Sequence, residues 1–312
     1  MILLFPLIVL IMPIDLSHSE TATAAEGTEE SYEVLWHTTG LPDGIPLSRP
    51  QGCCLDPVTS RIYVADTENN RVMVFTTEGT AIGTFYTSRP VERPFDIAIG
   101  PDRRIYISQI ERHVVEVFDQ KGVWQVSIPA DKGLSLAPGR MGFDHKGRLL
   151  VNDRKGGALW LMTKEGKILE KLHELKGDTR IILLTGLAVG PTGRIHVTSA
   201  QHSPVVTILE PEGTKFLSFG RHGALYDDSF SFPSSLALDS AGRIWVVDAF
   251  RHAIKVFDPE GKFLFNVGTF GEEPGRFVYP VDIDADRDGR MYVLEKGAGR
   301  LQAFSVAHNE AK

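Results

Sequence analysis

The sequence predicts an all-β fold, a six-bladed β-propeller of four-stranded blades, and three observations lead to this prediction. An arginine stands directly before a short apolar run six times, at intervals of about 45 residues. A proline lies ten or eleven residues before five of these arginines. Polar turns divide each unit into four short apolar runs, whereas helical periodicity is weak. The six arginines are Arg61, Arg104, Arg148, Arg194, Arg243 and Arg290.

The repeat proline opens the first strand of each unit, where its missing N–H removes no bond from the sheet. A brief apolar run such as residues 235–238 follows it, and then a polar turn with glycine such as residues 239–242. The fourth unit has Leu184 in place of proline. The five prolines are Pro50, Pro94, Pro138, Pro233 and Pro280.

The second strand follows the arginine and is apolar at consecutive positions, as in residues 244–247. A strand with both faces against neighbouring blades should have this pattern rather than strict alternation. Third strands are expected at residues 72–75, 114–118, 159–162, 205–209, 253–257 and 301–304. A further turn leads into a fourth strand, as in residues 262–268.

The last unit stops after its third strand, because residues 307–310 carry no apolar run behind it. Residues 31–40 look like the fourth strand and connector of the fifth unit. Donating this segment to the last blade would remove an open sheet edge and join the two chain ends. We therefore expect residues 32–37 to lie beside residues 300–305.

These units resemble the NHL repeat family of six-bladed propellers. The resemblance is carried by the stretch from Asp66 to Phe75 and by the fifth unit, Phe232 to Asp258, with Arg251 and His252 inside it. It covers residues 32–305 and implies the propeller fold. It says little about function, because propellers of this kind serve both as binding modules and as enzymes.

The composition fits one globular domain of this size. The chain has 312 residues, 42% hydrophobic and 23% charged, so a single propeller at residues 32–308 leaves no room for a second catalytic domain.

Residues 1–25 are expected to be an export signal and residues 26–31 a linker, which predicts a periplasmic or secreted protein without an integral membrane span. The apolar run at residues 2–14 is too short to cross a bilayer. It lacks a preceding lysine or arginine, which leaves an uncleaved anchor or a misassigned start as the alternatives.

The net charge of −7 argues against nucleic acid as a partner.

Cys53 and Cys54 occupy positions that other units fill with small apolar residues, so we expect buried free thiols and no crosslink.

Twelve loops should gather at one end of the propeller, around the channel mouth. The residues two positions after the repeat proline should face the axis near this end, and three of the six are charged: Asp96, Arg140 and Asp282. As a site, Arg140 would contact an anion, and Asp96 and Asp282 would hold the arginine or a cation. Alternatively, these charges pair with one another.

Carboxylates and an amide end several of the second strands, and cations follow in the loops. Asp66, Asp153 and Asp248 are expected to cap their own turns, and His113 and His252 to pack in turns rather than bind metal. The loop cations make this end locally basic within an acidic protein. We expect Arg112, Arg154 and Arg251 to contact a protein partner or a small anionic ligand.

The turn with Asp284, Asp286 and Asp288 matches an EF-hand loop pattern up to Glu295. Glu295 lies at the far end of an intervening strand, roughly 20 Å away, so it cannot be a ligand. The three aspartates either hold a structural calcium ion or form a solvated acidic turn, and no other cofactor is expected.

No catalytic motif is recognisable. Peptide-amidating lyases, which resemble NHL repeats, use histidine ligands for zinc, but the positions after the repeat proline hold no histidine here. Those positions are Gln51, Phe95, Gly139, Thr185, Ser234 and Val281. We therefore expect a non-catalytic binding propeller. The alternative is a metal-dependent lyase or hydrolase centred on Asp96, Arg140 and Asp282.

Overall fold

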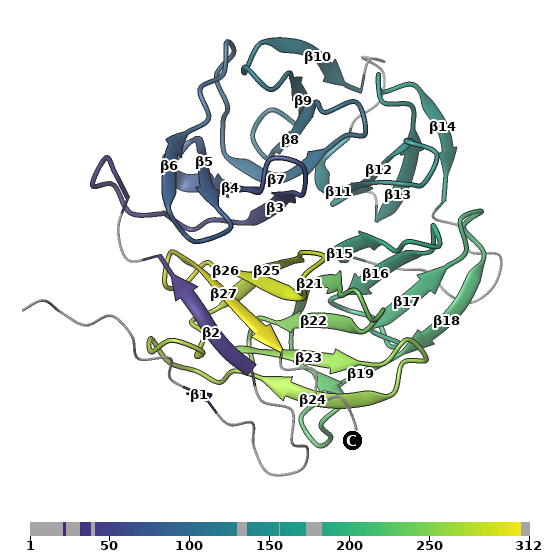
Figure 1. Cartoon of the computed structure of the whole chain (residues 1–312). Coiled ribbons are helices and arrows are strands. Elements are labelled where there is room, and N and C mark those ends of the chain that lie inside the picture. The colour runs from purple at the N-terminus through teal and green to yellow at the C-terminus, as the bar shows by residue number, and fades with distance from the viewer. Residues whose placement is uncertain are drawn as a thin grey trace, which may run out of the picture.

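The computed structural model describes residues 21–22, 32–38, 41–129, 136–155, 157–172 and 183–306 (Figure 1). Six antiparallel sheets surround a central axis, which confirms the six-bladed propeller. Contacts between successive inner strands follow chain order, and the inner strand of the last blade contacts that of the first, so the ring is closed.

The strands of each blade are given from the axis outward. Blade 1 contains β3 (Gly52–Asp56), β4 (Arg61–Asp66), β5 (Arg71–Thr76) and β6 (Ala81–Thr84). Blade 2 contains β7 (Pro94–Ile99), β8 (Ile105–Gln109), β9 (Val114–Phe118) and β10 (Trp124–Ile128). Blade 3 contains β11 (Pro138–Phe143), β12 (Leu149–Asp153), β13 (Ala158–Met162) and β14 (Ile168–Lys171).

Blade 4 contains β15 (Leu184–Val189), β16 (Ile195–Ser199), β17 (Val206–Leu209) and β18 (Lys215–Phe219). Blade 5 contains β21 (Pro233–Leu238), β22 (Ile244–Asp248), β23 (Ala253–Phe257) and β24 (Phe263–Val267). Blade 6 contains β25 (Pro280–Ala285), β26 (Arg290–Glu295), β27 (Arg300–Val306) and β2 (Tyr32–His37). Short elements are β1 (Thr21–Ala22), β19 (Arg221–His222), β20 (Ser229–Phe230) and the 3-10 turn Thr67–Asn69.

The N-terminal strand β2 pairs antiparallel with β27, from Tyr32 opposite Val306 to His37 opposite Gln302. Figure 1 shows the two strands side by side. The Trp36 indole N–H also donates to the Thr77 carbonyl in blade 1 at 2.8 Å. Strand β2 therefore completes blade 6 and contacts blade 1.

The predicted export signal falls outside the described residues except for β1. Thr21 and Ala22 pair with Glu33 and Tyr32 at the outer edge of blade 6. Among the described residues, no helix is long and apolar enough to span a bilayer.

The core lies between neighbouring blades, as the apolar second strands predict. Between blades 5 and 6, for example, the fully buried Trp245 packs on Phe265 and Phe304, with ring centroids 5.8 and 6.2 Å apart. Cys53 is buried and Cys54 is half-buried, and both are free thiols, as expected.

The side chains at the ends of the second strands hold the connectors that enter their blades. Asp248 accepts hydrogen bonds from the backbone N–H groups of Ser231 and Phe232, each at 2.8 Å. Equivalent bonds join Asp66 to Ser48 N, Gln109 to Glu92 N, Asp153 to Ala137 N and Glu295 to Val278 N. The prediction that the aspartates cap their own turns through backbone N–H groups was wrong for Asp66 and Asp248. It was confirmed for Asp153, which accepts a hydrogen bond from Lys155 N as well as from Ala137 N. These bonds fix the approach of the loops to the channel mouth.

Candidate functional site

A β-bulge follows the start of the inner strand in five of the six blades. The register shifts between Pro94 and Asp96 in blade 2, and between the equivalent positions of blades 3 to 6. A bulge redirects the side chains on either side of it. As a result, most residues directly after the repeat proline line a cavity at the mouth, whereas the charged residues one position further on meet at the axis.

Arg140 lies at the centre of the axis. Its Nη1 is 3.1 Å from Asp96 Oδ1 and 2.8 Å from Asp282 Oδ2, and all three residues are at most 5% exposed. The remaining guanidinium nitrogens donate to the carbonyls of Thr185 (Nε) and Val281 (Nη2), at 3.2 and 2.9 Å. The structure thus brings the three predicted residues together as a buried ion-paired group, not as open charges at the rim.

The two carboxylates also bind the backbone of neighbouring blades. Asp96 Oδ2 accepts from Met141 N at 2.7 Å, and Asp282 Oδ2 accepts from Cys53 N at 2.7 Å. The Ser235 hydroxyl donates to Asp282 Oδ1. Together with the bond from Arg140 to Thr185, this axial cluster links all six blades.

Burial changes the proton affinity of groups along the axis. It raises the pKa of Asp96 to about 7, against the opposing effect of Arg140. Burial also raises the pKa of Asp284, two residues after Asp282 in β25, to about 6. For Arg140, burial is outweighed by Asp282 and Asp96, so the pKa of the guanidinium is raised and it stays charged.

The mouth cavity, with a volume of 590 Å³, lies above the axial cluster at the loop-rich end. Five of its lining residues are arginine or lysine, and no aspartate or glutamate is among the described residues that line it. The cationic residues are Arg93, Arg140, Arg154, Lys155 and Lys296. A cavity lined in this way is positive although the whole chain is acidic.

Several of these cations lack a carboxylate partner. Arg154, Lys155 and Lys296 form no ion pair with the described residues; the Arg154 guanidinium lies over the Phe95 ring at 4.5 Å and the Lys296 ammonium over Tyr279 at 5.8 Å. Partial burial, and then the charge of Arg140, lower the pKa of Arg154. Burial, and then nearby Arg49, lower the pKa of Lys296. Crowded, unpaired cations of this kind would be stabilised by a bound anion.

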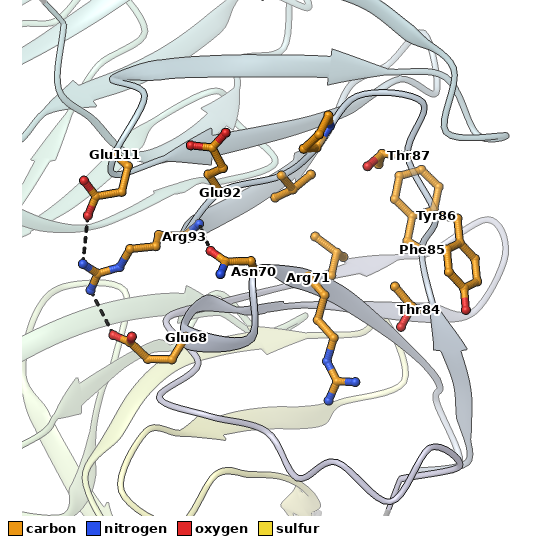
Figure 2. Close-up of a pocket in the computed structure, with 13 residues that line it drawn as sticks. Glu68, Asn70, Arg71, Thr84, Phe85, Tyr86, Thr87, Glu92, Arg93 and Glu111 are labelled. Atoms are coloured by element: carbon orange, nitrogen blue, oxygen red, sulfur yellow. Dashed lines mark hydrogen bonds and ion pairs between the residues drawn. The ribbon is translucent and has the colours of Figure 1, made fainter.

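Arg93 forms the wall between the mouth cavity and a second hollow. This groove, of 690 Å³, lies between blades 1 and 2 (Figure 2). The Arg93 guanidinium bridges Glu68 and Glu111 at 2.9 Å each, and its backbone N–H donates to Asn70. Arg93 is therefore held in place by both blades, with its own charge balanced on the groove side.

A third cavity, of 420 Å³, lies below the axial cluster and is lined by Cys53, Cys54 and Asp284. Arg140 borders both this cavity and the mouth cavity, so it divides the channel in two.

The three aspartates proposed for calcium have other contacts. Asp284 accepts from the backbone N–H groups of Leu55 and Ala285, and Asp286 accepts from Asp288 N and the Tyr292 hydroxyl. In the part of the chain that the structure describes, no three His, Cys, Asp or Glu side chains gather closely enough to hold a metal ion. Calcium binding at this turn stays a prediction that these contacts do not support.

Only one of the three predicted loop arginines lines the mouth cavity. Arg154 does, whereas Arg112 lies 3.6 Å from Glu116, and Arg251 donates to the Gly223 carbonyl at 2.7 Å. Sequence reasoning missed Arg93, Phe232 and Tyr279, which directly precede repeat prolines. The sequence signal that could have found them is the large side chain directly before the repeat proline in three units. At this position Arg93 and Tyr279 adopt positive φ angles of 43° and 55°.

Comparison with known proteins agrees with this architecture. A family model for the NHL repeat matches residues 47–75, and one described as a 6-bladed beta-propeller matches residues 228–310. The chain is therefore a six-bladed β-propeller in which residues 47–75 match the NHL repeat.

Similar proteins include NHL repeat-containing protein 3 of Homo sapiens, 24% identical over 80% of this chain and 77% of that protein. The Mus musculus protein of the same name is 24% identical over 82% of this chain and 79% of its own length. Protein brain tumor of Drosophila melanogaster is 33% identical over 25% of this chain and 8% of that protein.

Two similar solved structures are enzymes. One is a gluconolactonase from Xanthomonas campestris, with a TM-score of 0.66 and 13% identity, covering 94% of this chain and 99% of that one. The other is a streptogramin B lyase, with a TM-score of 0.60 and 13% identity, covering 88% of this chain and 97% of that one. At this identity the likeness is one of fold.

Proposed function

We propose that this propeller is a non-catalytic binding protein that holds a small anionic ligand in the mouth cavity. The observation that carries the proposal is a set of three cations, Arg154, Lys155 and Lys296, that line the cavity and have no carboxylate partner among the residues that the structure describes. The cavity volume of 590 Å³ is within the range of about 300–1,000 Å³ typical of small-molecule sites.

The alternative, a metal-dependent lyase or hydrolase centred on Asp96, Arg140 and Asp282, draws less support from the geometry. Asp96 and Asp282 already accept hydrogen bonds from Arg140 and from backbone N–H groups with their carboxylate oxygens. These contacts favour a role in holding the blades together.

The experiment is a calorimetric titration with methyl phosphate and acetate, two small anions of defined charge. Arg154→Ala combined with Lys296→Ala should weaken binding by at least about tenfold, since a hydrogen bond to a charged group contributes about 1.5–3 kcal/mol. The control, Lys121→Ala combined with Lys262→Ala, removes two exposed lysines from turns at the end of the propeller opposite the mouth. It changes the net charge equally and should leave affinity unchanged.

Equal losses in the two variants would show that overall charge, not the cavity, attracts the anion, and would contradict the proposal. Failure of the wild-type protein to bind any of the small anions tested would contradict it as well.

A further inference from the structure

One wall of the mouth cavity is aromatic. Phe232 and Tyr279 line the cavity from the connectors that enter blades 5 and 6. Because six blades follow one another around the axis, these two blades lie across the mouth from blades 2 and 3, which supply Arg93, Arg154 and Lys155. Arg93, Arg154 and Lys155 therefore lie, together with Phe95, on the side of blades 2 and 3. Phe232 and Tyr279 face them from blades 5 and 6, where Lys296 lies over the Tyr279 ring.

The aromatic wall continues outward from the cavity through Phe250. Its ring stacks on Phe232, with centroids 4.8 Å apart and an angle of 30° between the planes, and lies 5.6 Å from Tyr279. Although these rings hold it, Phe250 remains 53% exposed. Beside it, His252 accepts from Tyr279 N, and the ring of Phe270, which is 65% exposed, lies 4.9 Å from the imidazole.

Such an arrangement is unfavourable in the absence of a ligand. Leaving apolar ring surface in water forgoes about 25 cal/mol for each Å² that could be buried. Contiguous exposed apolar surface beside a cavity is typical of a binding site. The connector that carries Phe232 is fixed by Asp248, so the wall is already formed before any ligand arrives.

We infer that the ligand is an anion that carries an aromatic ring, such as an aryl phosphate or an aryl carboxylate. Its anionic group would bind Arg154 and the other free cations, and its ring would pack against Phe232, Phe250 and Tyr279. This inference rests on the proposed function, which concerns the anionic group, and adds an aromatic ring to the proposed ligand.

The test compares anions that differ only in the ring: phenyl phosphate against methyl phosphate, and benzoate against acetate. An aromatic contact contributes about 0.5–1.5 kcal/mol in addition to area burial, so the aryl member of each pair should bind at least about twofold more tightly. The phosphate and carboxylate pairs also show which anionic group the cations prefer.

Phe250→Ala should reduce the ratio of phenyl phosphate affinity to methyl phosphate affinity towards one, because it removes part of the wall against which the ring packs. The matched control is Phe216→Ala, which removes another exposed phenylalanine, 47% exposed, from β18 at the outer edge of blade 4. It should leave both affinities as in the wild type.

If methyl phosphate binds and Arg154 is required for binding, but phenyl phosphate has no advantage, the inference is overturned and the proposed function stands. An advantage that survives Phe250→Ala would also overturn the assigned position of the ring. If none of the four anions binds, the proposed function itself fails.

Discussion

Arg140 of blade 3 and Asp282 of blade 6 form an ion pair of 2.8 Å across the propeller axis. The pair joins two blades that lie opposite each other. Asp96 of blade 2 forms a second ion pair with Arg140, at 3.1 Å. A stacked ring of sheets depends mainly on apolar contacts between neighbours. The axial cluster adds polar contacts that link non-neighbouring blades, and it closes the floor of the mouth cavity.

We predict that Arg140→Ala destabilises the protein by about 3–5 kcal/mol, because it leaves two buried carboxylates without their cation. Urea unfolding measures the effect. As a control, Arg276→Ala removes an exposed arginine, 3.8 Å from Glu273, and should change stability by no more than about 1 kcal/mol. A loss in Arg140→Ala as small as that of the control would show that the cluster does not hold the blades together.

The raised pKa of Asp284 predicts a specific pH dependence. The folded state holds this proton up to a pKa of about 6, whereas the ordinary value is 3.8, so the folded state binds more protons between these values. The stability of the wild type relative to Asp284→Asn should therefore fall as the pH rises from about 4 to 6, and then stay constant.

A shift of this size corresponds to at most about 3 kcal/mol, and the partial exposure of Asp284 should make the change smaller. Urea midpoints of both proteins across this pH range give the difference directly. A relative stability that increases with pH would mean that Asp284 is stabilised as a carboxylate and would contradict the prediction.

The contact between β2 and blade 1 predicts an effect at Trp36. Trp36→Ala removes a half-buried ring and the hydrogen bond to Thr77, and should cost about 2–3 kcal/mol. Trp36→Phe keeps an aromatic ring and should lose only about 1 kcal/mol. On the same strand, Leu35→Ala changes a side chain that is 39% exposed and should have little effect on unfolding. If all three variants matched the wild type, β2 would contribute nothing to closing the ring.

The connector to blade 5 offers a fourth prediction. Asp248→Ala leaves two backbone N–H groups, those of Ser231 and Phe232, without their acceptor, and should cost about 2–4 kcal/mol. Asp248→Asn retains one acceptor oxygen and should cost less. Because Phe232 belongs to the aromatic wall, Asp248→Ala should also reduce the preference for phenyl over methyl phosphate. A variant that loses stability but keeps the full preference would show that this connector does not position the wall.

The fold could be predicted from the sequence because its signals repeat. Proline, glycine turns and the arginine before each second strand recur in nearly constant register, so each unit supports the interpretation of the others. The axial residues Asp96, Arg140 and Asp282 followed from the same register. Their pairing was one of two alternatives, because sequence spacing does not give the distance between side chains on opposite blades.

The mouth cavity could be predicted only in part. Its residues come from connectors of unequal length, and the bulge after each repeat proline determines which side chains enter it. Arg154 lines the mouth cavity and the other two predicted loop arginines do not, and the reason is local. Arg112 and Arg251 have carboxylates four and three residues away on their own hairpins, Glu116 and Asp248, whereas Arg154 contacts the Phe95 ring instead.

The most direct test of the central claim is a crystal structure of the protein determined with phenyl phosphate. We predict that the phosphate lies within hydrogen-bond distance of Arg154 or Lys296 in the mouth cavity, with the phenyl ring against Phe232 and Phe250. A structure in which phenyl phosphate occupies another surface, with the mouth cavity holding only water, would contradict the account.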